Sequence, residues 1–193
     1  MQALRLTLMC HARTAAQKVA RFPLDEPVEL DWQALRGSRA ASYKRAPTLL
    51  CGPETRTRQT AELFAGPATV VDALRDCDFG RWRGVRINDL QRDEPQALQT
   101  WLADRDVVPH GGESVAQLCA RVEDWLQSLQ GQTGHVLAIT HPFVIRAALC
   151  KVMHALPVAF NTLDVEPLAA VELRFNGRWR LRLAAMDFEE ELE

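Results

Sequence analysis

The chain has 193 residues, of which 47% are hydrophobic and 25% charged, and its formal net charge at pH 7 is −2. This size and composition suit one α/β domain with a sizeable core, which we expect to span residues 1–193. The charge excludes a global basic field for nucleic acid or an anionic membrane, and no apolar run approaches the roughly 20 residues of a membrane span.

The cysteines and the two ends of the sequence bear on the compartment. Five cysteines are an odd number and form no CxxC pair, so we expect reduced thiols and a cytoplasmic protein. The first apolar run contains Arg5 and His11 and lacks a cleavage site, so we expect no signal peptide. The acidic stretch at residues 189–193 is expected to be a solvated, frayed tail.

The first element, residues 4–10, is an apolar run that ends abruptly at His11. This is typical of a buried strand that delivers one side chain to the edge of a sheet. Residues 15–28 contain two prolines and several charges and predict an irregular loop. In chain order we then expect a helix over 31–42, a strand over 47–51, a helix around 56–64, a strand over 68–71 and an irregular loop over 74–84.

The second half opens with a helical stretch from about residue 87 to 102 that is interrupted at Pro95. Ser114 and Gln117 predict a capping box for an amphipathic helix. A strand over 135–140 and a helix over 143–154 should follow, with Pro142 at the first helical position. Asn176-Gly177, between residues 170–175 and 179–184, is a strong β-hairpin signal. This alternation predicts a three-layer α/β/α sandwich with a mainly parallel sheet and an antiparallel C-terminal edge hairpin.

Four side chains in this pattern suggest chemistry on a phosphate. His11 and His141 each follow a strand, and ligands collect at the carboxyl ends of strands in open α/β sheets. Arg56 lies near a helix start, where its forked guanidinium can hold two phosphate oxygens. Neutral imidazole is a nucleophile near pH 7, and a carboxylic acid such as Asp76 can protonate a leaving oxygen. These are the parts of phosphoryl transfer through a phosphohistidine.

Five ordered motifs resemble those of the histidine phosphatase (phosphoglycerate mutase-like) superfamily, and together they cover nearly the whole chain. Cys10-His11-Ala12-Arg13-Thr14 is similar to the family's Arg-His-Gly-x-Thr. The remaining matches are, in chain order, Arg56-Thr57-Arg58-Gln59-Thr60-Ala61, the loop from Leu74 to Gly84, Gly111-Gly112-Glu113-Ser114, and Thr140-His141-Pro142-Phe143-Val144-Ile145-Arg146.

The resemblance implies a role for each of the four side chains. His11 would attack phosphorus and carry the phosphoryl group, while Arg56 and His141 would hold its equatorial oxygens. Asp76 would protonate the leaving group, although Asp78 is equally near in sequence. The resemblance also places Cys10, Arg13, Thr14 and Pro142 beside the substrate, and it implies neither a metal nor another cofactor.

The chain departs from the family pattern next to the proposed nucleophile. The family's first arginine is Cys10 here, and a thiol supplies neither the charge nor the forked donors. Arg13 is a possible replacement, three positions further on. Cys10 itself reads either as a reactive thiol or as a small buried residue. A metal site of Cys10, His11 and His141 has no ligand spacing in its favour.

The sequence therefore predicts a metal-independent phosphatase that acts on a small phosphorylated substrate through a phosphohistidine. The rival interpretation is a catalytically degenerate protein of the same fold that binds phosphate or regulates. A mutase is disfavoured because the region after Asp76 lacks a long lid. We expect inorganic phosphate or a phosphorylated metabolite as the partner, with no nucleic acid or membrane, and the sequence leaves the substrate and the oligomeric state open.

Overall fold

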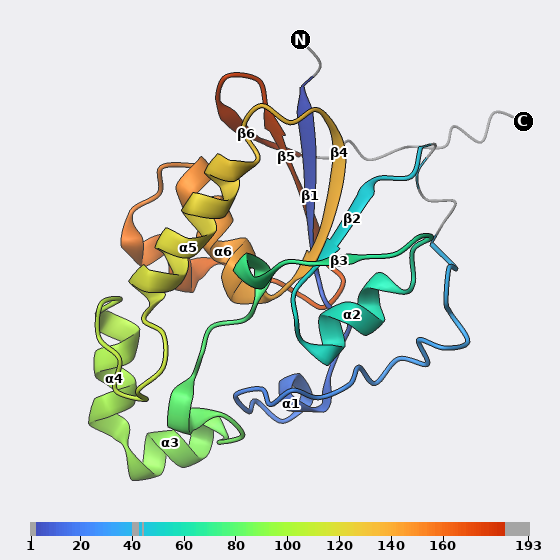
Figure 1. The fold of residues 1–193 in the computed structure, drawn as a ribbon. Coiled ribbons are helices and arrows are strands. Elements are labelled where there is room, and N and C mark those ends of the chain that lie inside the picture. Colours follow the sequence, from blue (N-terminus) through green and yellow to red (C-terminus); the bar gives the residue numbers. More distant parts are fainter. Residues whose placement is uncertain (1–2, 40–42, 44, 184–193) are drawn as a thin grey trace, which may run out of the picture.

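The computed structural model describes residues 3–39, 43 and 45–183, and within them one six-stranded sheet has the order β3-β2-β4-β1-β5-β6 (Figure 1). Strands β3, β2, β4 and β1 run parallel, whereas β5 and β6 are antiparallel to their neighbours. The predicted fold class is therefore confirmed. The strands are β1 (Leu4–Cys10), β2 (Thr48–Cys51), β3 (Thr69–Val70), β4 (Gly134–Thr140), β5 (Ala170–Phe175) and β6 (Trp179–Arg182).

Helices cover both faces of the sheet, with α5 and α6 on one face and α2 on the other (Figure 1). The α-helices are α1 (Ala15–Lys18), α2 (Thr55–Ala61), α3 (Ile87–Asp93), α4 (Pro95–Ala103), α5 (Val115–Ser128) and α6 (Pro142–Val152). Among the residues that the structure describes, the short 3₁₀ helices are η2 (Asp72–Leu74), η3 (Gly80–Trp82) and η4 (Pro157–Thr162).

The strands fit this sandwich because side chains alternate between its two faces. In β1, Leu6 and Leu8 enter the larger core with α5 and α6, and Cys10 follows them on the same face. In β4, Leu137 and Ile139 enter the smaller core under α2. Strand β4 is thus buried on both sides, because Val136 and Ala138 lie in the larger core, and this explains its nearly continuous apolar sequence. Strand β1 alternates instead, with Arg5 and Thr7 between its leucines.

Two predictions for residues 15–42 are wrong. The loop expected over 15–28 begins with α1, because the Thr14 N–H donates to Oε1 of Gln17 at 3.1 Å in a capping box. The helix expected over 31–42 is a series of turns over residues 32–39, and 40–42 lie outside the described residues. Gly37, with φ of 70°, donates its N–H to the Glu62 carbonyl, so tertiary contacts override the helical pattern here.

Other local predictions are confirmed. Ser114 opens α5 as a capping box, since its Oγ accepts from the Gln117 N–H at 3.0 Å. Pro142 is the first residue of α6. Asn176 and Gly177 connect β5 to β6, with Gly177 at φ of 77°. The 74–84 segment, expected to be irregular, contains η3, and the acidic tail lies outside the described residues.

All five cysteines are free thiols. Within residues 3–39, 43 and 45–183, no helix is both long and apolar enough to cross a bilayer.

Candidate active site

The two histidines predicted at strand ends meet at one edge of the sheet. The His11 N–H donates to the Thr140 carbonyl at 2.9 Å, which continues the β1–β4 ladder by one residue. The His11 and His141 ring centroids are 5.2 Å apart, and the rings are tilted by 60°. Strand β2 ends at the same edge, where the Gly52 N–H donates to the Ile139 carbonyl at 3.0 Å. Three parallel strand ends therefore supply the base of the site.

His11 is held as a neutral imidazole in one tautomer. Its Nδ1 lies 2.7 Å from the Ala12 carbonyl, and because a carbonyl only accepts, Nδ1 carries the proton. Nε2 then keeps its lone pair. Burial, together with the charges of His141 and Arg56, lowers the pKa of His11 to about 3. The His11 ring is therefore neutral at neutral pH, with a lone pair on Nε2, and 3% of its surface is exposed.

Arg56 joins the site from the first turn of α2 and is 2% exposed. Its Nη2 donates to Oδ2 of Asp76 at 2.6 Å, and its Nη1 donates to the Leu24 carbonyl at 3.0 Å. Its buried Nε has no hydrogen-bond partner among the described residues. This Nε–H group of the buried Arg56 can therefore donate a hydrogen bond to a ligand oxygen.

Asp76 is the anion that balances Arg56. Its Oδ1 accepts the Cys77 N–H at 2.9 Å, so both oxygens of the carboxylate are occupied. Burial opposes ionisation, but the charges of His141 and Arg56 outweigh it and hold the pKa of Asp76 below its usual range. Asp78, the other predicted acid, caps a turn instead, because its Oδ1 accepts the Gly80 N–H at 2.9 Å.

Glu54 is a site residue that the sequence reasoning missed. Its Oε2 lies 2.8 Å from Nε2 of His141, and its Oε1 accepts the Asp76 N–H at 2.9 Å. Burial alone would raise the pKa of Glu54. The hydrogen bond to His141 and the charge of His141 have the larger, opposite effect and lower this pKa to about 2. The sequence offered only its position, two residues before Arg56 and three after the end of β2, which does not by itself indicate these contacts.

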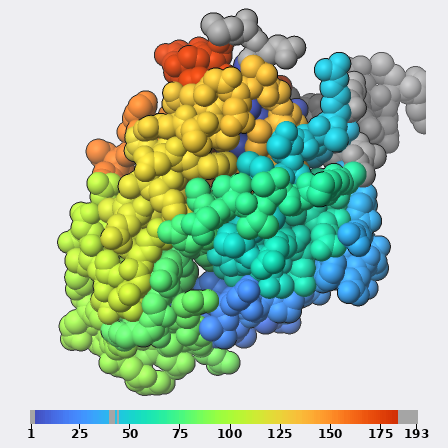
Figure 2. Space-filling model, viewed as in Figure 1, coloured from blue at the N-terminus to red at the C-terminus, as the bar shows by residue number. Residues whose placement is uncertain are grey.

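A cavity of about 220 Å³ lies beside Glu54, Arg56 and Asp76, between residues 23–25, the start of α2 and the loop over 74–84, here called the acid loop. Neither His11 nor His141 lines it. The space-filling view shows a hollow where the green segment near residue 80 approaches the blue N-terminal segment (Figure 2). The lining residues carry charges of both signs and include the apolar side chains of Pro23, Leu24 and Phe79. They are Pro23, Leu24, Asp25, Glu54, Arg56, Arg75, Asp76, Cys77, Asp78, Phe79 and Arg83.

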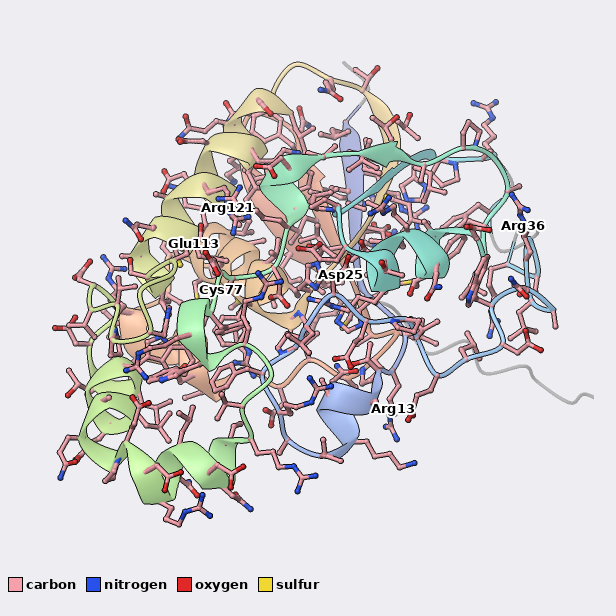
Figure 3. The ribbon with its side chains drawn as sticks, turned by 60° about the horizontal axis from the view of Figure 1, so that its bottom comes forward. Arg13, Asp25, Arg36, Cys77, Glu113 and Arg121 are labelled. Atoms are coloured by element: carbon pink, nitrogen blue, oxygen red, sulfur yellow. The ribbon has the colours of Figure 1, made fainter. Side chains whose placement is uncertain are left out.

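The residues that were expected to assist the substrate are less close to this cavity. Arg13 is exposed, and Figure 3 shows it beyond α1, away from Asp25 at the cavity. Thr14 caps α1, and Pro142 begins α6 next to His141. None of these three lines the cavity.

Cys10, also expected beside the substrate, is wholly buried in the larger core. Burial and the charge of Asp76 raise the pKa of its thiol to about 12. Cys10 is therefore uncharged at neutral pH, and the reactive-thiol reading finds no support in its surroundings. In the described part of the chain, no three His, Cys, Asp or Glu side chains are grouped as metal ligands.

Arg121 of α5 holds the backbone of the acid loop in place through hydrogen bonds from its guanidinium. Its Nη1 donates to the carbonyls of Ala73 and Arg75 at 2.8 and 3.2 Å. Its Nε and Nη2 bind both oxygens of Glu113, at 2.9 and 2.7 Å. Figure 3 shows Arg121, Glu113 and Cys77 close together beside the loop. This buried pair thereby sets the backbone from which Asp76 projects.

Replacing Arg121 by methionine is expected to lower the free energy of unfolding by about 3 kcal/mol, because Glu113 loses its main counter-charge while staying buried. Urea titration would measure the change. Arg92→Met is the control, since its ion pairs with Asp89 and Asp93 are exposed and the free energy of unfolding should stay that of the parent. Equal losses in the two variants would contradict this anchoring role.

Comparison with known proteins places this geometry in context. Residues 6–186 match the model of the histidine phosphatase superfamily (branch 1). Glucosyl-3-phosphoglycerate phosphatase of Mycobacterium tuberculosis is 29% identical over 178 residues, which cover 82% of this chain and 79% of that protein. Phosphoserine phosphatase 1 of Hydrogenobacter thermophilus is 24% identical over 160 residues, which cover 77% and 76% respectively.

A solved structure shares the fold. It is a mycobacterial glucosyl-3-phosphoglycerate phosphatase in complex with VO3, with a TM-score of 0.78 and 23% identity. The match covers 93% of this chain and 97% of the other.

Proposed function

The chain belongs to the histidine phosphatase superfamily (branch 1), and on this premise we propose that it hydrolyses phosphomonoesters of a small metabolite through a phosphohistidine. The observation that carries the proposal is His11, a neutral imidazole with Nε2 unprotonated. It lies beside His141 and feels the charge of Arg56, which lines the cavity. The curated relatives named above are phosphatases.

The proposed reaction has two displacements at phosphorus. Nε2 of His11 attacks, the bond to the ester oxygen breaks, and the leaving oxygen takes a proton. A water molecule then attacks the phosphohistidine, the N–P bond breaks, and inorganic phosphate leaves. Nε of Arg56 and Nδ1 of His141, both buried donors without partners among the described residues, are the proposed contacts to the phosphoryl oxygens.

Asp76 is the proposed proton carrier for both steps. In the free protein it is ionised and bound to Arg56. A phosphoryl dianion next to Asp76 would raise the pKa of its carboxyl group, because like charges favour the protonated form. It would then protonate the leaving oxygen in the first step and accept a proton from water in the second.

The rival function is a phosphate-binding or regulatory protein without catalysis. It is favoured by the charge balance of the site, where two carboxylates, Glu54 and Asp76, accompany one arginine and Cys10 is uncharged. Hydrolysis of p-nitrophenyl phosphate, with and without vanadate, separates the two functions. Vanadate-sensitive turnover supports the phosphatase, whereas vanadate binding without turnover supports the rival.

Cys10→Arg is expected to increase turnover of p-nitrophenyl phosphate by about 10²-fold, the effect of one added donor to developing charge. This aryl ester suits the test because its good leaving group depends little on a proton from Asp76. Steady-state kinetics would measure the gain, with Cys10→Ser as the uncharged control. A folded Cys10→Arg protein with unchanged turnover would contradict the view that a missing charge limits catalysis.

A further inference from the structure

The His141 ring lies between two carboxylates. Its Nε2 is 2.8 Å from Oε2 of Glu54, and its Nδ1 is 3.4 Å from Oδ2 of Asp76. Only the Nε2 contact is a hydrogen bond, while Nδ1 has no hydrogen-bond partner among the described residues and lies near the charge of Asp76. The ring is wholly buried, so solvent does little to screen the two negative charges. The two flanking carboxylates favour the protonated ring, and this attraction acts against the desolvation that burial imposes on it.

Gly52 leaves the space that the Glu54 carboxylate needs. A Cβ at position 52 would lie 2.9 Å from Oε2 of Glu54 and 3.2 Å from Nε2 of His141. Any other side chain would therefore press on the hydrogen bond between them. The turn after β2 therefore allows the Glu54 carboxylate to reach the His141 ring.

The net charge of the site indicates what the contact between Glu54 and His141 does. Cys10 is neutral, and Arg56 is already paired with Asp76. Glu54 adds a further negative charge, so a neutral His141 would leave the site negative overall. A phosphoryl dianion would then be repelled from the place where it must bind.

We propose that Glu54 is a positioning residue that keeps His141 protonated through neutral pH, so that Nδ1 of His141 donates to the phosphoryl group and supplies the charge missing at Cys10. This inference rests on the phosphoryl site proposed above. It is consistent with the unpartnered state of Nδ1, which leaves this nitrogen available to a phosphoryl oxygen.

Between about pH 5.5 and pH 8.5, the proton on the His141 ring is the one whose gain or loss an experiment can follow without interference from its neighbours. Within this range His11 stays neutral and both neighbouring carboxylates stay ionised, because their pKa values lie well below. Arg56 stays charged, and Cys10 stays neutral. The charged and titratable groups facing the ring are Glu54 before α2, Arg56 in α2, Asp76 in the acid loop and His11 after β1.

Sulfate is a suitable probe because it remains a dianion across this range. Calorimetric titration of the full chain should show a sulfate affinity that changes less than about 3-fold between pH 6 and pH 8. Glu54→Gln should match the parent at pH 5.5 and bind sulfate at least about 10-fold more weakly at pH 8, the loss of one charge-assisted hydrogen bond. Glu62→Gln, at the end of α2, is the matched control and should follow the parent.

The outcomes separate this inference from the proposed function. Parallel pH profiles for the parent and Glu54→Gln would overturn the role of Glu54 while leaving the phosphoryl site intact. Tighter sulfate binding by Glu54→Gln at every pH would also overturn it, because Glu54 would then merely repel anions. A parent protein that binds neither sulfate nor phosphate would refute the phosphoryl site itself, and the inference with it.

A second measurement does not depend on the variant folding. Nitrogen NMR of the parent protein, labelled in histidine, should show His141 with both ring nitrogens protonated at pH 7.5. His141→Gln identifies the signal. A neutral His141 ring in the parent would overturn the inference.

Discussion

Replacing His11 by alanine is expected to reduce turnover of p-nitrophenyl phosphate by at least about 10⁴-fold, since loss of a nucleophile removes the covalent route entirely. The fold should survive, because the side chain of His11 makes one hydrogen bond, to its neighbour's carbonyl, and the ladder uses only its backbone. Steady-state kinetics with a far-ultraviolet spectrum of the variant would measure both properties.

His154→Asn is the control for His11→Ala. His154 is exposed after α6, and its φ of 51° is one that asparagine tolerates. Its turnover should equal that of the parent. Substantial turnover in His11→Ala would mean that another group, or water directly, attacks phosphorus.

Arg56→Ala is expected to weaken phosphate binding by at least about 10²-fold, whereas Arg13→Ala should bind phosphate like the parent. Arg56 is buried at the cavity, while Arg13 is exposed beyond α1. Arg56→Ala should also lose about 3 kcal/mol of stability, because Asp76 would remain buried without its counter-charge.

Phosphate titration and urea unfolding would measure the two effects separately. Arg56→Ala/Asp76→Asn should recover stability without recovering phosphate affinity, since the unpaired charge is gone but the guanidinium is still missing. Unchanged phosphate affinity in Arg56→Ala would remove Arg56 from the anion site.

The strand-end argument explains why part of the site was predictable. His11 and His141 directly follow β1 and β4, and parallel strands that pair must end side by side. Their proximity therefore needed only the correct strand assignment and pairing. The same holds for Arg56, which follows β2 after one turn.

Glu54 was not predictable by this argument, because its role depends on contacts between distant segments. Its carboxylate reaches His141 past Gly52, which has no side chain to block it. Its second oxygen binds the backbone of Asp76, in another loop. Neither contact leaves a periodic or motif signal in the sequence.

Arg13 illustrates the opposite error, in which nearness in sequence suggested nearness in space. Thr14 opens α1 immediately after Arg13, and the chain turns away from the sheet edge at that point. The side chain of Arg13 is then exposed, while His11 two residues earlier is buried. Positions two apart differ this much where a strand gives way to a helix.

The identity of the phosphorylated residue tests the central claim most directly. The protein should be mixed with labelled p-nitrophenyl phosphate, quenched rapidly in alkali, which preserves phosphohistidine, and mapped by mass spectrometry. The account predicts one phosphoryl group on His11 that forms and decays within a turnover. Turnover with no labelled protein at the earliest quench times, or with the label on a residue other than His11, would contradict it.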